Sequence, residues 1–177
     1  RRTRVVRGLM ARGPYYSLFG IGPYTFAPYK VVWLRIGTRI TAAVVSRKRG
    51  GACTRELIIP NDSTVFVPFD REDEAHYFCA LLNSTPAQFV VRTTSVLSTG
   101  SFASPHILEK IAIPQFDPAA PLHRKLAGLG REAAAAARWQ GKTGILEDRI
   151  DAGAAELWRL TDRELSLIKK ELLTVYS

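Results

Sequence analysis

A chain of 177 residues, 46% of them hydrophobic, can form one domain of ordinary size and is too apolar for a disordered tail. Its formal net charge is +9, and no apolar run approaches the ~20 residues that a membrane span requires. We therefore expect no membrane partner. With two cysteines and no visible secretory signal, we expect a reducing, cytoplasmic location.

The positive charge is concentrated in residues 1–50. This segment contains eleven Lys and Arg and no Asp or Glu, whereas residues 51–100 contain three basic and six acidic residues. A local block of one sign predicts a contact surface for the opposite sign, and nucleic acid is the commonest such partner. Because the chain begins at Arg1 without a Met, we interpret it as a fragment, with residues 1–14 a linker from a missing upstream domain.

The next stretch is rich in aromatic residues and predicts a β region. Gly22-Pro23 and Ala27-Pro28 prevent a long helix, and the rings there suit either base stacking or an ordinary core. Residues 30–37 and 40–46 are β-branched and apolar, which predicts two paired strands. Two further strands are predicted at residues 57–60 and 64–69, around a turn at Asn61-Asp62.

After Asp70 the apolar residues recur with the period of a helix and no longer with that of a strand, which predicts helices. Asp70 is placed to cap a helix whose apolar stripe is Ala75, Phe78, Cys79 and Leu82. Residues 85–88 have the pattern of a capping box and begin a second helix, which runs to about residue 94. A polar loop at 95–104, a short helix at 105–110 and a strand at 111–114 follow.

The C-terminal part is predicted to be helical after a proline-marked linker at residues 115–121. Long helices are expected at 122–139 and 145–160, and a capping box at 161–164 begins a last helix. The whole pattern predicts an α+β fold. Residues 15–114 form a twisted, mainly antiparallel β region with short helices, and residues 115–177 form a long helical arm or hairpin.

Basic side chains in the β region and its loops are the candidate DNA contacts. Phosphates pair with Arg and Lys, and an arginine can also bind guanine with two hydrogen bonds. The candidates are Arg47, Lys48 and Arg49 in a glycine-rich loop, then Lys30, Arg35 and Arg39, and more weakly Arg92. Lys30 and Arg35 have opposite parity on one strand, so at most one of them should meet DNA from that sheet surface. A plain solvated turn remains open for residues 47–49.

Small polar residues in the loop at 95–104 are further candidates. Their hydroxyls can bond phosphates or base edges, and Gly100 permits a close approach. They are Ser98, Thr99 and Ser101. An ordinary loop that caps a helix explains the same residues equally well.

Catalytic and metal-binding patterns are missing from the sequence. His76, His106 and His123 are too widely spread to read as a metal set, and no cysteine pair has zinc spacing. The string GKTG at 141–144 lacks the upstream glycine of a phosphate-binding loop, and no nucleophile elbow is present. We expect no metal, no cofactor and no catalytic residue in this fragment.

Four segments in order resemble one protein family. They are PYKVVWLRI (28–36), HYFCALLNS (76–84), SFASPHILEKIAIP (101–114) and ELWRLTDRE (156–164). This order resembles the specificity, or target-recognition, domain of bacterial N6-adenine DNA methyltransferases of the TaqI kind. That family includes fused restriction–modification enzymes, and type I specificity subunits are more distant relatives.

The resemblance implies sequence-specific binding of duplex DNA on behalf of a methyltransferase domain of the same protein. That domain would flip the target adenine and methylate it from S-adenosylmethionine, and in fused members of the family an endonuclease is joined to it. Since recognition loops vary in sequence within the family, no base-reading residue carries over. The family's catalytic tetrapeptide and cofactor-binding glycine motif are missing here, so the fragment itself is expected to be inactive.

Two other functions stay open. The helical arm could dock a partner subunit, which would make the chain an assembly domain. Single-strand RNA binding fits the charge, although the aromatic strand signature of ribonucleoprotein-motif readers is not found.

Overall fold

A three-stranded antiparallel sheet forms from segments rich in β-branched and aromatic residues. The computed structural model describes residues 21–46, 58–94, 102, 105–139, 141 and 143–176. Its strands, in the order β2-β1-β3, leave β1 central. They are β1 (Tyr29–Leu34), β2 (Ala43–Ser46) and β3 (Thr64–Phe69). Val31 pairs with both Val44 and Val67, which confirms the predicted pairing of the first two strands.

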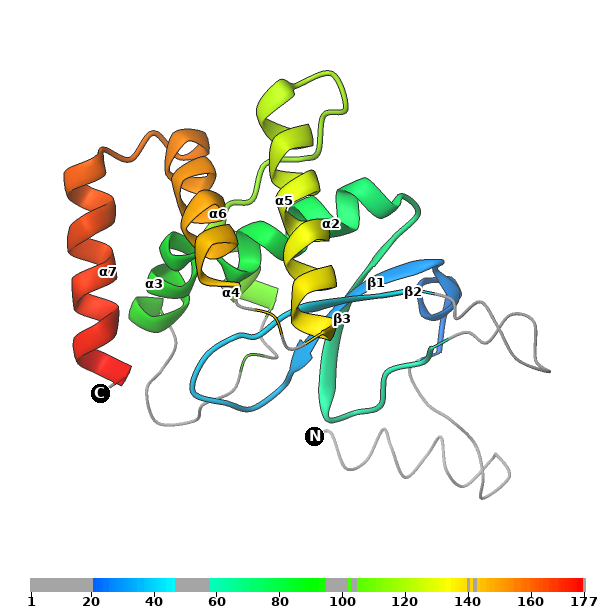
Figure 1. The fold of residues 1–177 in the computed structure, drawn as a ribbon. Helices are drawn as coiled ribbons and strands as arrows, with labels where there is room; N and C mark the ends of the chain where they lie inside the picture. The colour runs from blue at the N-terminus through cyan, green and yellow to red at the C-terminus, as the bar shows by residue number, and fades with distance from the viewer. Residues whose placement is uncertain are drawn as a thin grey trace.

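Helix α2 (Glu72–Asn83) lies between this sheet and the C-terminal helices (Figure 1). Its predicted apolar stripe packs in one cluster with Val31 and Trp33 of β1, which are 0% and 3% exposed. The opposite side of α2 is buried as well, because Tyr77 and Leu81 pack against helix α5 (Pro121–Arg138). The helix is therefore covered on two sides, where the sequence pattern had predicted one.

The remaining helices bring the two predicted parts of the chain together. Helix α3 (Thr85–Thr94) contacts the short α4 (Pro105–Ile111) and also α6 and α7, which lie beside it in Figure 1. Helix α6 (Gly144–Leu157) packs on α5 as the second half of a helical hairpin, and α7 (Asp162–Tyr176) is the last helix. A single 3-10 turn, η1 (Pro23–Phe26), precedes β1. Within the described ranges, no helix combines the length and apolar character needed to span a membrane.

One of the three predicted helix caps is confirmed. At the start of α7, Thr161 N–H donates to Glu164 Oε2 at 2.8 Å, and Glu164 N–H donates to Thr161 Oγ1 at 3.3 Å. This is a capping box, and it lowers the pKa of Glu164 because Thr161 donates to the ionised carboxylate from its backbone and its hydroxyl.

The other two predicted caps are wrong, although α3 begins at Thr85 as predicted. Arg71, not Asp70, occupies the N-cap of α2, and its side chain makes no capping bond. Thr85 and Gln88 make no capping box, since Gln88 bonds carbonyl groups elsewhere and Thr85 donates to Asp151 of α6. Tertiary partners have replaced the local ones.

Two predicted strands are also wrong. Residues 58–60 are irregular, with Ile58 and Ile59 exposed just before the Asn61 turn; Leu57 lies outside the described residues. Residues 111–114 are not a strand either, because Ala112 adopts a φ of 52° where α4 ends. A left-handed residue stops both helix and strand, and Ile113 then packs its side chain into the core from an irregular segment.

Candidate nucleic-acid interface

The loop that joins β1 to β2 presents two of the predicted arginines. We call residues 35–42 the arginine loop, and the side chains of Arg35 and Arg39 are both exposed on it. Arg35 N–H donates to the Ser63 carbonyl at 2.9 Å, and its guanidinium donates to the Asp62 carbonyl at 3.3 Å. Arg35 is thereby tied to the turn that precedes β3.

Asn83, the last residue of α2, holds the far end of the arginine loop. Ala42 N–H donates to Asn83 Oδ1 at 2.8 Å, and Asn83 Nδ2 donates to the Ala42 carbonyl at 2.9 Å. The Cys79 thiol also donates to that carbonyl at 3.4 Å, and burial raises the pKa of this thiol to about 12. At neutral pH, Cys79 is therefore a protonated core residue, as the sequence predicted, and not a nucleophile.

Gln88 of α3 holds the middle of the same loop. Its buried Nε2 donates to the carbonyl oxygens of Ile40 and Leu82, both at 2.9 Å. Because Ile40 directly follows Arg39, this bond fixes the backbone beside one of the exposed guanidinium groups. The loop is thus held by side chains of two helices, and its backbone order does not depend on a bound partner.

Phe102 contacts the arginine loop from a distant part of the sequence. Phe102 N–H donates to the Arg35 carbonyl at 2.7 Å, and Trp33 Nε1 donates to the Phe102 carbonyl at 3.3 Å. A Cβ added at Gly37 would lie 3.5 Å from the Phe102 ring, which is 4% exposed. The predicted polar loop at 95–104 is therefore anchored beside Arg35 at its one described residue.

Lys30 is not placed as a DNA contact requires. The side chain is 2% exposed, and Nζ donates to the Ala27 carbonyl at 2.8 Å. A buried ammonium needs such acceptors to offset its lost hydration, which makes Lys30 a structural residue of β1. Arg35, in contrast, lies beyond the end of β1 in the arginine loop, where its side chain is exposed.

Of the remaining candidates, one belongs to the residues that the structure describes and six do not. Arg92 is partly exposed in the last turn of α3, away from the arginine loop in sequence but on the helix that carries Gln88. Six others lie outside the described residues: Arg47, Lys48, Arg49, Ser98, Thr99 and Ser101.

Sequence reasoning missed the residues that hold the site. The sequence pattern predicts a capping box for Gln88 and a loop for Phe102, and it assigns no contact to Asn83. For Gln88 the available signal was its place on an apolar helix face, since an amide that is buried there must find hydrogen-bond partners.

Among the described residues, no group of three or more His, Cys, Asp or Glu could hold a metal ion. Comparison of the chain with protein-family models, with curated proteins and with solved structures gives no match in any of the three.

Proposed function

We propose that this chain binds duplex DNA in a sequence-dependent way, as the target-recognition domain of an N6-adenine DNA methyltransferase or restriction–modification enzyme. The observation that carries the proposal is the arginine loop, where Arg35 and Arg39 are exposed on a backbone bonded to Asn83, Gln88 and Phe102. An exposed arginine on an ordered backbone loses little entropy when it binds a phosphate or a guanine edge.

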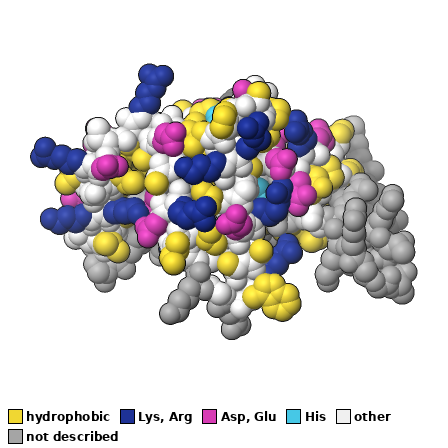
Figure 2. Space-filling view, turned by 45° about the horizontal axis from the view of Figure 1, so that its top comes forward, with side chains coloured by type: hydrophobic (Ala, Val, Ile, Leu, Met, Phe, Trp, Pro, Cys, Tyr) yellow, Lys and Arg dark blue, Asp and Glu magenta, His cyan; other side chains and the backbone are white. Residues whose placement is uncertain are grey.

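The distribution of charge along the sequence also supports DNA binding by the segment that contains the arginine loop. The arginine loop belongs to the segment 1–50, which has eleven basic and no acidic residues. Figure 2 shows a different pattern over the visible helical face, where Lys and Arg alternate with Asp and Glu. A face of mixed sign has a weak net field, whereas a one-sign segment attracts phosphate over several ångströms.

In this proposal, the methylation reaction takes place in another domain and not in this chain. The recognition domain would grip the duplex, and an upstream methyltransferase domain of the parent protein would bind S-adenosylmethionine and methylate the flipped adenine. Affinity would come mainly from phosphate neutralisation and fall steeply with salt.

Selection from a random duplex pool tests this proposal. The chain is incubated with the pool at low and moderate salt, and the bound DNA is sequenced. Enrichment of one short motif is expected, together with a loss of binding in the variant Arg39→Glu. Arg163→Glu, the same charge change on the exposed face of α7, is the matched control and should bind like the wild type. Absence of binding at low salt would overturn the proposal.

A second function, docking of a partner subunit through the helical arm, is favoured by one observation. Trp139 and Ile145, at the joint between α5 and α6, are 87% and 79% exposed. Exposed tryptophan is a typical anchor residue of protein interfaces. In the parent protein, Trp139→Ala should weaken subunit assembly in sedimentation and leave DNA binding intact, whereas replacing Arg47, Lys48 and Arg49 by Glu should do the opposite.

A further inference from the structure

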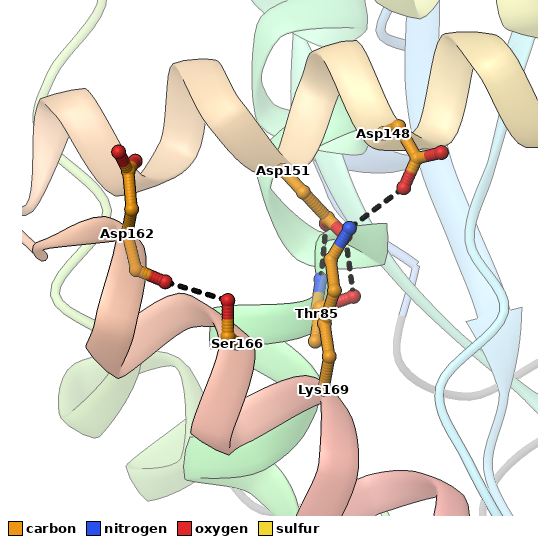
Figure 3. A network of polar contacts seen from close by, with 6 residues as sticks. All are labelled: Thr85, Asp148, Asp151, Asp162, Ser166 and Lys169. Carbon is orange, nitrogen blue, oxygen red and sulfur yellow. Dashed lines mark hydrogen bonds and ion pairs between the residues drawn. The ribbon is translucent and has the colours of Figure 1, made fainter.

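A buried carboxylate of the C-terminal arm caps a helix of the β-rich part. Asp151 of α6 is 5% exposed, and its Oδ1 accepts the backbone N–H of Thr85 at 2.7 Å. Its Oδ2 accepts the Thr85 hydroxyl at 2.6 Å (Figure 3). The first turn of α3 therefore receives its cap from a residue 66 positions away, in place of a neighbour in sequence.

A lysine of the last helix neutralises this carboxylate. Lys169 Nζ of α7 lies 3.0 Å from Asp151 Oδ2 and 2.7 Å from Asp148 Oδ1, and Figure 3 shows it reaching from α7 toward α6. Partial burial acts to lower the pKa of Lys169, but the two aspartates bond and attract the ammonium, and the net effect raises this pKa. Lys169 therefore stays charged at neutral pH.

The capped helix is the one that holds the arginine loop. Gln88 lies one turn after Thr85 on α3, and its amide bonds the Ile40 carbonyl next to Arg39. A continuous series of bonded groups thus leads from Lys169 through Asp151 and Thr85 into α3, and from Gln88 to the arginine loop. The packing of α7 and the position of the arginine loop therefore both depend on α3.

We propose that Asp151 and Lys169 are positioning residues for DNA binding, and that the seating of α7 regulates the arginine loop through α3. The inference rests on the proposed function. Its physical basis is that removing Lys169 leaves the charge of the buried Asp151 carboxylate uncompensated, which costs more than breaking an exposed pair. A partner that displaced α7 would take Lys169 away from Asp151 and so loosen the cap on α3.

Substitution of Lys169 tests the coupling. Lys169→Met removes the charge, Lys169→Arg keeps it, and Glu132→Gln breaks the exposed Arg149–Glu132 pair between α5 and α6 as a control. Two readouts are taken: affinity for the enriched duplex over a range of salt, and hydrogen exchange of the amides of Ala42 and Thr85 against those of β3. If Lys169→Met does not fold, the same two readouts are taken on Asp151→Asn, which keeps an acceptor for Thr85.

We expect Lys169→Met to weaken DNA binding about tenfold with an unchanged salt slope, because no phosphate contact is removed. Exchange should rise at Ala42 and Thr85 and stay constant in β3, and Lys169→Arg should restore both readouts. Unchanged exchange at Ala42 would overturn the proposal, as would an affinity loss matched by Glu132→Gln. If the wild type binds no DNA, the proposed function fails, and the exchange experiment still decides whether α7 controls the loop.

Discussion

The side chain of Asn83 pairs with the backbone of Ala42 as one strand pairs with another. Its Oδ1 accepts the Ala42 N–H at 2.8 Å, and its Nδ2 donates to the Ala42 carbonyl at 2.9 Å. Both polar groups of Ala42 are thereby satisfied just before β2 begins, in a residue that is 7% exposed. A helix end thus takes the place of a neighbouring strand and fixes where the arginine loop returns to the sheet.

Replacement of Asn83 should destabilise the protein through this pair. Asn83→Asp keeps the acceptor for the Ala42 N–H and turns the donor into an oxygen that faces the Ala42 carbonyl. We expect a loss of about 1–3 kcal/mol in the free energy of unfolding, measured with urea, because the buried Ala42 carbonyl loses its amide donor, faces a carboxylate oxygen and keeps only the weak Cys79 thiol donor. A loss as small as that of an ordinary surface substitution, within about 0.5 kcal/mol, would contradict the pairing.

Two glycines of α5 should respond in opposite ways to alanine. A Cβ at Gly130 would lie 2.4 Å from the His76 carbonyl oxygen and 3.1 Å from Ala80 Cβ, so α2 and α5 would have to move apart. We expect Gly130→Ala to cost about 1–3 kcal/mol of stability. A Cβ at Gly128 meets nothing within 4 Å, so Gly128→Ala should stabilise α5 by up to about 1 kcal/mol. Thermal or urea unfolding of the pair provides the measurement and its internal control.

Removal of the Tyr77 hydroxyl should not weaken the fold. Its oxygen is buried between α2 and α5 without a hydrogen-bond partner in the described part of the chain, and burial raises the pKa of Tyr77 to about 12. Since an unsatisfied buried hydroxyl costs free energy, we expect Tyr77→Phe to raise the unfolding free energy by up to about 1 kcal/mol. A loss of more than that amount in urea unfolding would show that the hydroxyl is bonded.

Stability should fall in mild acid because of His76. Burial and the charge of Arg131 lower the pKa of this histidine, and Glu72 and Asp73 oppose them only in part. Since the folded pKa lies below the unfolded value of 6.5, the unfolded state binds the proton first. Stability is therefore fully present above pH 6.5 and decreases as the pH falls toward the folded pKa, by at most about 1.4 kcal/mol per pH unit.

The variant His76→Gln isolates this effect. Its unfolding free energy, measured in urea between pH 7.5 and 5, should depend less on pH than that of the wild type. NMR titration of the imidazole in the folded protein checks the direction of the shift directly. An imidazole that titrates above 6.5 would refute the assignment.

Features that depend on neighbours a few residues apart could be predicted from the sequence alone. The strand at Thr64–Phe69, the apolar stripe from Ala75 to Leu82 and the Thr161–Glu164 capping box were predicted and are confirmed. Strand alternation, the helical period and capping distances all depend on residues a few positions apart. They can therefore be predicted before the fold is known. The choice of duplex DNA as partner also comes from the sequence and stays a prediction.

The polar side chains that hold the site are chosen by packing between distant segments of the chain. Asp151 replaces a local cap at Thr85 from 66 positions away, and Asn83 reaches Ala42 from 41 positions away. Lys30 turned inward for the same reason, since its environment depends on which segments cover that face of the sheet. A buried polar group must be bonded, but the partner that satisfies it is chosen by packing, and no spacing in the sequence encodes that choice.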